Sequence, residues 1–442
     1  MSANLKIISD LREFITLSSQ EGKLRQIFTT SPKDFSRKRK LHFERVVCML
    51  LNFFKKSYSI EIAEFFSWIG ADELTTSKSA FSQQRLKINC FFFNCLNMVL
   101  VDSFYTHYQN EVKRWNGLRV IAVDGSTAYL IDKEEITAHF GTHGNQRGTV
   151  TLGRILCAFD ALNQITIKAD RYPIGWSEQK IALEWLPDYE PDMLLVYDRA
   201  YPGFISIFHH QNKEQSQPFL MRCPVGFSNE IKAFVKGELN DAISTFTANK
   251  AACRELKSQG FIVRVGTGIP VRLIRVVLDD GSIEVLVTNL FDQQKYPYSE
   301  FKMLYFMRWG IETRFGSFKN QLQLEAFSGQ KVETILQDFY CTIFLSNLQE
   351  IISKPSQEKV NERTSKCKYS YQVNRNIAIG LMKNRVVNLL LSNNPEEVII
   401  QLQNLFAQYI EPIRPNRKLP RIRKLKRRSG KYKTLTNYKR AI

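Results

Sequence analysis

The sequence lacks paired cysteines, a signal-peptide core and any apolar run long enough to cross a membrane. Its eight cysteines include no Cys-x-x-Cys pair, which excludes the usual zinc-finger and thioredoxin motifs. The N-terminal segment has no apolar core of the kind that signal peptides need. The most apolar stretch, residues 90–101, is too short to span a bilayer and contains two asparagines. We therefore expect a cytoplasmic protein of a reducing compartment.

Acidic residues are scarce relative to basic ones. There are 43 Asp and Glu against 62 Lys and Arg, so the net charge is +19 at pH 7 and the isoelectric point is near 9.5. Such an excess is typical of proteins that bind polyanions, of which nucleic acid is the commonest. Simple solubility and an anionic membrane surface are the alternatives. The imbalance is strongest in residues 412–442, which have thirteen Lys or Arg and no acid. They are expected to form a flexible, polyanion-binding tail, or else a solvated tail without a specific role.

The pattern of the sequence changes near residue 118. Before it, apolar residues recur at helical spacing without strand-like alternation, so residues 1–112 are predicted to be a helical, DNA-binding region. Residues 60–68 and 78–91 are two expected helices, and Ser77 is a candidate N-cap for the second. They could form a helix-turn-helix, and a plain helical bundle is the alternative.

Residues 113–352 are predicted to form an α/β domain. Helices are expected at 177–186 and 203–210, and strands at 119–123, 149–159, 164–169, 193–197 and 219–223. A hairpin followed by β-α-β crossovers implies a mixed sheet with helices on its faces. A β-rich insertion is expected within 224–300, with strands at 261–265, 271–278 and 283–290 around an Asp-Asp-Gly-Ser turn. Helix returns at 299–352, followed by a helical C-terminal region, 353–411, and the basic tail.

The segment from Tyr305 to Lys319 carries four functional side chains in one pattern. On a helix that turns ~100° per residue, Tyr305, Arg308, Glu312 and Lys319 fall within about 60° of one another. A helix packed in a core would have apolar side chains on such a stripe. An acid between an Arg and a Lys instead suits a helix that faces a phosphate backbone, with the acid holding a metal. A solvated face with incidental ion pairs is the alternative.

Two aspartates, Asp124 and Asp198, each close an apolar strand. In an open α/β sheet, ligand sites lie at the carboxyl ends of strands. Either aspartate alone would be expected as a turn or N-cap residue. Two of them, together with the helical Glu312, match the oxygen-donor set that a hard metal ion needs.

Other titratable residues are weaker candidates. Zinc suits the sequence less than Mg²⁺, because no zinc-type spacing joins His139, His143, His209 and His210. Three further acids near the predicted core are expected at turn, strand-edge or helix-surface positions: Asp160, Asp170 and Glu178.

Taken together, these motifs resemble the insertion-sequence-four family of DDE transposases. The resemblance rests on Asp124-Gly-Ser, Asp198-Arg-Ala-Tyr and the family's Y-R-E-K signature, which is matched at Tyr305, Arg308, Glu312 and Lys319. It extends over residues 118–348. It implies an α/β fold (α+β overall) with a ribonuclease-H-like, mixed-sheet catalytic core, a β-rich insertion and helical flanks. In such a core the two aspartates lie side by side, and the Glu comes from a later helix.

The resemblance also implies an activity, namely cut-and-paste excision and strand transfer of an insertion sequence in the bacterial nucleoid. The three carboxylates would hold two Mg²⁺ ions, for which Mn²⁺ could substitute, roughly 3.5–4 Å apart. Arg308 and Lys319 would bind DNA phosphates, and Tyr305 would donate a hydrogen bond to one. Arg199 would do likewise beside a metal-binding aspartate. Related enzymes that excise through a DNA hairpin can stack a flipped base on a tryptophan in the insertion, and this chain has no Trp between Asp198 and Tyr305.

Two other functions remain compatible with the sequence. A ribonuclease-H-fold endonuclease would cut DNA without joining it. A non-catalytic DNA-binding derivative of a transposase would be marked by the loss of an acid, but all three acids are present.

The expected partners are the terminal inverted repeats of the element, the target DNA and a second copy of the chain. One set of acids handles one DNA end, so two ends require two chains, and we expect a homodimer on DNA. Two apolar stripes are candidates for its surface. The stripe around Ile335, Phe339 and Leu348 is expected to pack on the catalytic core, whereas the stripe at 386–391 is the candidate for dimer contacts.

The basic tail generates a first prediction. Deleting residues 413–442 should weaken binding to all DNA sequences alike and flatten the dependence of affinity on salt, because fewer counterions are released from the phosphates. The measurement is the slope of log affinity against log salt concentration, for the truncated and the full chain. An unchanged slope would show that the tail contacts something other than DNA.

Overall fold

The computed structural model describes residues 1–37, 39–52, 55–145 and 148–414. Most of the predicted basic tail therefore lies outside the described residues. The chain forms two compact units, and each is built from separated segments. The helical unit comprises Met1–Glu111, Thr127–Gly153 and Phe315–Ile442, and the sheet unit comprises Val112–Ser126 and Arg154–Arg314. The sequence had suggested contiguous domains instead. None of the described helices is both long and apolar enough to cross a membrane.

The N-terminal part of the helical unit is helical, as the spacing of apolar residues indicated. Ser2 caps the first helix by accepting a hydrogen bond from the Leu5 amide, and Ile7, Leu11 and Ile15 form the buried face of that helix. The helices are α1 (Ala3–Gln20), α2 (Gly22–Phe28), α3 (Phe43–Leu51), α4 (Tyr58–Trp68), α5 (Lys78–Arg85) and α6 (Phe91–His107), with a 3₁₀ turn at Asp72–Leu74.

The helix that was expected to start after Ser77 does so. The Ser77 hydroxyl accepts a hydrogen bond from the Ala80 amide. The helix ends at Arg85, however, and a new one begins at Phe91, so the expected helix 78–91 is too long. Ile88, which lies between these two helices, forms a β-bridge with Thr29. A residue inside a continuous helix could not form such a bridge.

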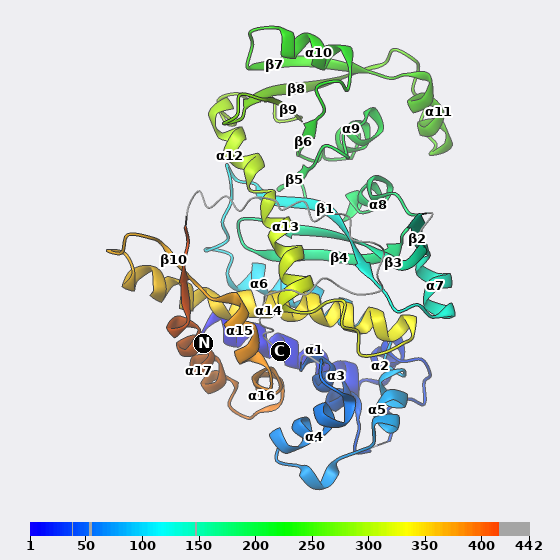
Figure 1. The fold of residues 1–442 in the computed structure, drawn as a ribbon, viewed down its shortest axis with the longest axis vertical. Coiled ribbons are helices and arrows are strands. Elements are labelled where there is room, and N and C mark those ends of the chain that lie inside the picture. Colours follow the sequence, from blue (N-terminus) through cyan, green and yellow to red (C-terminus); the bar gives the residue numbers. More distant parts are fainter. Residues whose placement is uncertain (38, 53–54, 146–147, 415–442) are drawn as a thin grey trace. The chain divides into compact units, whose positions relative to one another are not determined.

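The C-terminal part of the helical unit is organised by one long helix, α14 (Val332–Arg363), which packs on α6 and α17. It passes through residue 352, where the sequence had suggested a domain boundary. Figure 1 shows it in yellow, and the smaller elements of this unit are α7 (Glu134–Phe140), β2 (Thr142–Asn145), β10 (Tyr371–Val373), α15 (Arg375–Met382), α16 (Arg385–Leu391), α17 (Pro395–Gln408) and β11 (Ile410–Pro412).

The apolar stripe at 386–391 does not form a free surface. Val386, Val387 and Leu390 are buried, because α16 packs against α3 and α17 of its own unit. The stripe around Ile335 and Phe339 is buried as well. The proposal that residues 386–391 make dimer contacts is therefore wrong, since helical periodicity alone cannot tell an internal contact from an external one.

A buried ion pair joins α5 to α14. The guanidinium group of Arg85, which is fully buried, donates to Asp338 at 2.9 Å and to Gln337 at 2.9 Å. It also donates to the Tyr58 hydroxyl at 2.8 Å and to the Ser328 hydroxyl at 2.7 Å. Breaking a buried pair by removing one partner typically costs about 3–5 kcal/mol, because the remaining charge is left unpaired. This network thus ties segments that lie far apart in the sequence.

The expected mixed sheet with helices on its faces is present, and all of its strands except β2 lie wholly or partly in the sheet unit, so the α/β fold class is confirmed. The strand order is β2-β3-β1-β5-β6-β9-β8-β7, with β4 paired to β3. The first strands are β1 (Arg119–Tyr129), β3 (Gly148–Asp160), β4 (Ile165–Pro173), β5 (Met193–Tyr197) and β6 (Phe219–Cys223). A hairpin on one side of β1 and two parallel strands on the other are what a ribonuclease-H-like core requires.

The predicted β-rich insertion extends this same sheet. Its strands β7 (Asp241–Thr247), β8 (Gly268–Val277) and β9 (Ile283–Thr288) continue the sheet beyond β6 in antiparallel pairs. The expected strand at 261–265 is absent. Phe261 packs against Phe208 and His209 instead, and the chain turns at Gly266, whose φ of +87° favours glycine.

Helices cover both faces of the sheet unit. One apolar cluster joins Ile121 and Val123 of β1 to α8 (Glu178–Glu184), and another joins Val120 and Val196 to α12 (Phe301–Phe306). Because strand side chains alternate, each face of β1 meets one of these helices. The other helices of this unit are α9 (Phe204–Gln211), α10 (Asn229–Lys236), α11 (Lys250–Ser258) and α13 (Trp309–Gly316), the last of which runs on into the helical unit.

Candidate functional site

The site is centred on Asp124 and Asp198, which lie at matching positions of two parallel strands. The paired residues run from Arg119 with Met193 to Ala122 with Val196. Continued by two residues, this register sets Asp124 opposite Asp198. Neighbouring strands lie about 4.8 Å apart, so the two carboxylates are close.

The two aspartates differ in how their strands end. Asp198 follows the last residue of β5, as expected. Asp124, by contrast, does not close its strand, because β1 continues to Tyr129. What ends near Asp124 is the pairing with β5, and beyond that point β1 is paired with β3 alone. Asp124 is therefore at the end of a pairing, which leaves its carboxylate free to face the α12 side of the sheet.

Both carboxylates accept hydrogen bonds from the chain that follows them. Asp124 Oδ1 accepts from the Gly125 amide at 2.8 Å, and Asp198 Oδ1 accepts from the Ala200 amide at 2.7 Å. These bonds orient one oxygen of each carboxylate towards its own backbone. Arg199, the next residue after Asp198, is exposed.

The signature segment is not one continuous helix. α12 ends at Phe306 and α13 begins at Trp309, and the amides of Arg308, Gly310 and Ile311 bond three residues back instead of four. A π-helical turn, Ser317–Gln321, follows α13. The single regular stripe expected from Tyr305 to Lys319 is therefore wrong, because an angle computed from ideal geometry does not survive these changes of pitch.

Three of the four signature side chains nevertheless meet at Asp124. The guanidinium group of Arg308 lies between two acids, 3.3 Å from Asp124 Oδ2 and 3.1 Å from Glu312 Oε1. The ring of Tyr305 lies beneath it, with its centroid 5.6 Å from Cζ. The Arg308 side chain is only 6% exposed, so this charge is held in place and not solvated. The segment thus brings one cation and one acid to the aspartate pair.

Lys319 lies in the helical unit, in the π-helical turn, and is half-buried. Burial lowers the pKa of Lys319, and the negative charge of nearby Glu325 acts in the other direction.

A fourth acid, Glu178, belongs to the neighbourhood, although the sequence suggested only a helix-surface residue. It is the first residue of α8, and it forms an ion pair with Arg154 of β3. A side chain at Gly125 would overlap the Glu178 carboxyl group. The sequence does contain a glycine, Gly125, directly after a candidate metal ligand, which could have indicated a close contact at that position. No pattern in the sequence, however, connects Gly125 with residue 178.

The acids raise the proton affinity of the site. Burial raises the pKa of Asp124 to about 6, and the negative charges of Asp198 and Glu178 add to this effect. The Gly125 amide and the Arg308 guanidinium group act in the other direction without cancelling it. Burial likewise raises the pKa of Glu178, with Asp198 adding to the rise. The four acids of the site, Asp124, Asp198, Glu178 and Glu312, outnumber the two arginines that pair with them, Arg308 and Arg154.

This donor set suits a hard divalent cation. Carboxylate oxygens are the ligands that Mg²⁺ and Mn²⁺ prefer, and a site with excess negative charge attracts a cation. Within the described residues, no three acidic, histidine or cysteine side chains are already grouped so as to hold a metal ion. Asp124 and Glu312 are joined through Arg308 instead. A complete set of three carboxylates would thus require Arg308 to move aside.

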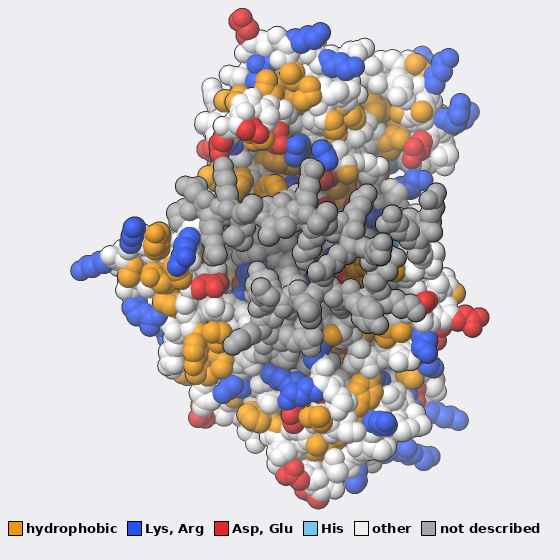
Figure 2. All heavy atoms as spheres, in the orientation of Figure 1, with side chains coloured by type: hydrophobic (Ala, Val, Ile, Leu, Met, Phe, Trp, Pro, Cys, Tyr) orange, Lys and Arg blue, Asp and Glu red, His pale blue; other side chains and the backbone are white. Residues whose placement is uncertain are grey.

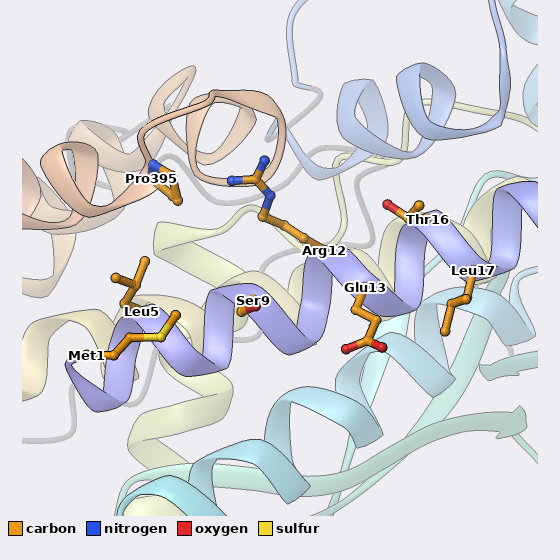
Figure 3. A pocket seen from close by; sticks show the side chains of 8 residues that line it. All are labelled: Met1, Leu5, Ser9, Arg12, Glu13, Thr16, Leu17 and Pro395. Atoms are coloured by element: carbon orange, nitrogen blue, oxygen red, sulfur yellow. The ribbon is translucent and has the colours of Figure 1, made fainter.

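Two of the larger hollows in the described part of the chain lie beside α8 and along α1. An open groove of about 760 Å³ begins at Tyr201, three residues after Asp198, and is lined by the first turns of α8, α9, α10 and α11. A hollow of about 350 Å³ runs along α1 and ends at Pro395 (Figure 3). Its charged residues are one Arg and one Glu, so it offers no cluster for catalysis. On the face in Figure 2, the visible Lys and Arg side chains are spread among apolar and acidic ones.

The raised pKa of Asp124 generates a prediction about the stability of the folded chain. Its pKa of about 6 in the folded chain exceeds the ordinary value of 3.8, so folding favours the protonated form. That contribution is fully present below pH 3.8 and is lost as the pH rises through about 6. At neutral pH, the ionised carboxylate should then cost about 3 kcal/mol. Asp124→Asn removes this cost, so the metal-free variant should unfold at a higher temperature than wild type near neutral pH.

Thermal unfolding in the presence of a chelator, followed from acidic to neutral pH, measures the effect. The advantage of Asp124→Asn should shrink as the pH falls. Asp279→Asn, at a carboxylate whose side chain is 82% exposed, is the matched control and should leave the transition unchanged. If Asp124→Asn is no more stable than wild type near neutral pH, the ionised Asp124 carboxylate does not destabilise the folded chain.

Comparison with solved structures gives a distant similarity. No family model and no curated protein matches the chain. Among solved structures, the chain is similar to the piggyBac transposase in a synaptic complex with hairpin DNA, determined by cryo-electron microscopy. The two share 10% sequence identity at a TM-score of 0.39, over 91% of this chain and 78% of that one.

Proposed function

We propose that the chain is a DDE transposase of the insertion-sequence-four type, which excises a mobile element and joins it to a target DNA. The observation that carries this proposal is the register of β1 and β5, which sets Asp124 opposite Asp198. The Arg308–Glu312 pair, on the segment with the Y-R-E-K spacing, lies against this aspartate. The order of these acids along the chain and their meeting in space both support the proposal.

The three acids Asp124, Asp198 and Glu312 are the groups that would hold the metal ions. Two bound Mg²⁺ ions supply charge stabilisation and an activated oxygen nucleophile for phosphodiester cleavage. The chain's own residues do the rest. The Gly125 and Ala200 amides orient the aspartates, and the buried position of Asp124 keeps bulk water from screening its charge. No catalytic Ser or Cys is needed, because phosphoryl transfer depends on positioning and electrostatics.

Arg308 has two roles in this proposal. Without DNA, it neutralises Asp124 and Glu312. A DNA phosphate offers the same guanidinium group a bidentate partner, so binding DNA would draw Arg308 away and release both acids. Its Nε atom is buried without a hydrogen-bond partner among the described residues, which leaves a donor available for such a ligand. Tyr305, Arg199 and, from the helical unit, Lys319 are proposed as further phosphate contacts.

The acids generate the central prediction. Asp124→Asn, Asp198→Asn and Glu312→Gln should each reduce cleavage by on the order of a hundredfold or more, while binding of DNA is retained. The substrate is DNA that carries the ends of the element encoding the chain, and cleavage and gel mobility are measured side by side. Asp279→Asn serves as the control and should cleave normally. Cleavage at the wild-type rate by any of the three variants would remove that residue from the site.

An endonuclease of the same fold is the second candidate, and strand transfer separates the two. With pre-cleaved ends and a target plasmid, a transposase joins the DNAs, whereas an endonuclease leaves them separate. Binding of the end DNA by the wild-type chain without any cleavage would instead favour the non-catalytic, DNA-binding derivative.

Assembly generates a further prediction. Each chain has one set of acids and the reaction uses two DNA ends, so we expect two chains per pair of ends. The mass of the complex with end DNA, measured by light scattering, should correspond to a dimer. A complex of a single chain with a single DNA end that still carries out strand transfer, at every ratio tested, would rule out the paired-end arrangement.

A further inference from the structure

Glu178 approaches the aspartate pair from the face of the sheet opposite Arg308. Val123 and Leu195 belong to the apolar cluster that includes α8, whereas Val120 and Val196 belong to the cluster that includes α12. Side chains alternate along a strand, so Asp124 faces α12 while Gly125 faces α8. Glu178, at the start of α8, therefore meets the backbone just after the aspartate.

This approach depends on the missing side chain of Gly125. A Cβ atom there would overlap the Glu178 carboxyl carbon and both of its oxygens. Gly125 has no positive φ, so its backbone conformation alone does not call for glycine. The close contact with Glu178 is what requires it, and it leaves little freedom to either partner.

The same turn of α8 also contacts the segment after Asp198. The Gln179 side chain donates a hydrogen bond to the Ala200 carbonyl oxygen. Tyr201 is 2% exposed and lies beside Glu178. The first two residues of α8 thus connect the two backbone segments that carry the aspartates.

Arg154 keeps the Glu178 carboxylate in this position. Its guanidinium group pairs with Glu178 through one nitrogen and donates to the Ile174 carbonyl oxygen, at 3.0 Å, through the other. The Glu178 side chain is 28% exposed and that of Arg154 is 19% exposed, so the pair is partly shielded from solvent. An ordinary surface ion pair would need neither the glycine nor the contact with the Asp198 segment.

We propose that Glu178 is a positioning residue of the acid site, which sets the spacing of Asp124 and Asp198 and adds negative charge behind them for a divalent cation. This inference rests on the proposed function. Glu178 acts through the two aspartates. Its contact with Gly125 holds the backbone of β1 just after Asp124, and the turn that it begins holds the segment after Asp198. Its charge also pairs with that of Arg154.

Mn²⁺ binding to the metal-free protein, measured by calorimetry together with thermal unfolding, tests the proposal. Glu178→Gln keeps the shape and removes the charge. It should weaken Mn²⁺ binding about tenfold, as is typical for partners of metal ligands, and leave the unfolding temperature near that of wild type. Glu184→Gln, an exposed acid on the same helix, is the matched control and should change neither quantity.

A second pair of variants separates shape from charge. Gly125→Ala should lower both the unfolding temperature and the Mn²⁺ affinity, because the new methyl group overlaps Glu178. Gly125→Ala with Glu178→Ala removes the overlap, so the unfolding temperature should recover while the Mn²⁺ affinity stays low. Wild-type Mn²⁺ affinity in Glu178→Gln, or recovery of both quantities in the double variant, would overturn the proposal.

Asp124→Asn, measured in the same way, distinguishes the two levels of the argument. If it abolishes Mn²⁺ binding while Glu178→Gln has no effect, Glu178 is a structural residue and the acid site stands. If neither variant alters Mn²⁺ binding, the proposed metal site itself fails.

Discussion

The register between β1 and β5 is the constraint on which the candidate site depends. A parallel pair with Ala122 beside Val196 sets Asp124 opposite Asp198, and a slip of one residue would turn one of them to the other face of the sheet. The buried apolar residues on both faces resist such a slip, because it would expose Val120 and Val123 to the wrong cluster. Packing in the core thus determines where two charged side chains lie.

The two faces of the sheet contribute different kinds of groups to this pair. From the α12 side come Arg308 and Glu312, which are in direct ionic contact with Asp124 or with each other. From the α8 side comes Glu178, which needs the absence of a side chain at Gly125. The aspartates lie between a cation that neutralises them and an acid that repels them. This opposition explains why burial and like charge together keep the pKa of Asp124 near 6.

The fold was largely predictable where local pattern and long-range packing agree. Apolar runs ended by an aspartate located β5 and the start of β1, and the Ser77 cap marked the first residue of α5. Prediction failed where packing overrode the pattern. Residues 261–265 have the composition of a strand, but Phe261 packs against Phe208 of α9 instead. The stripe at 386–391 looked like a surface for a second chain, but its own unit covers it.

By itself, the sequence determined which residues could do chemistry: their types, their order and the spacing of the signature from Tyr305 to Lys319. These properties are local, because a spacing along a helix or a position after a strand depends only on residues that are close together in the sequence. Only the tertiary structure decided that Arg308 lies between Asp124 and Glu312, and that Glu178 packs on Gly125. Those contacts depend on strand register, on the break between α12 and α13 and on helix packing, and each of these follows from the energy of the whole core.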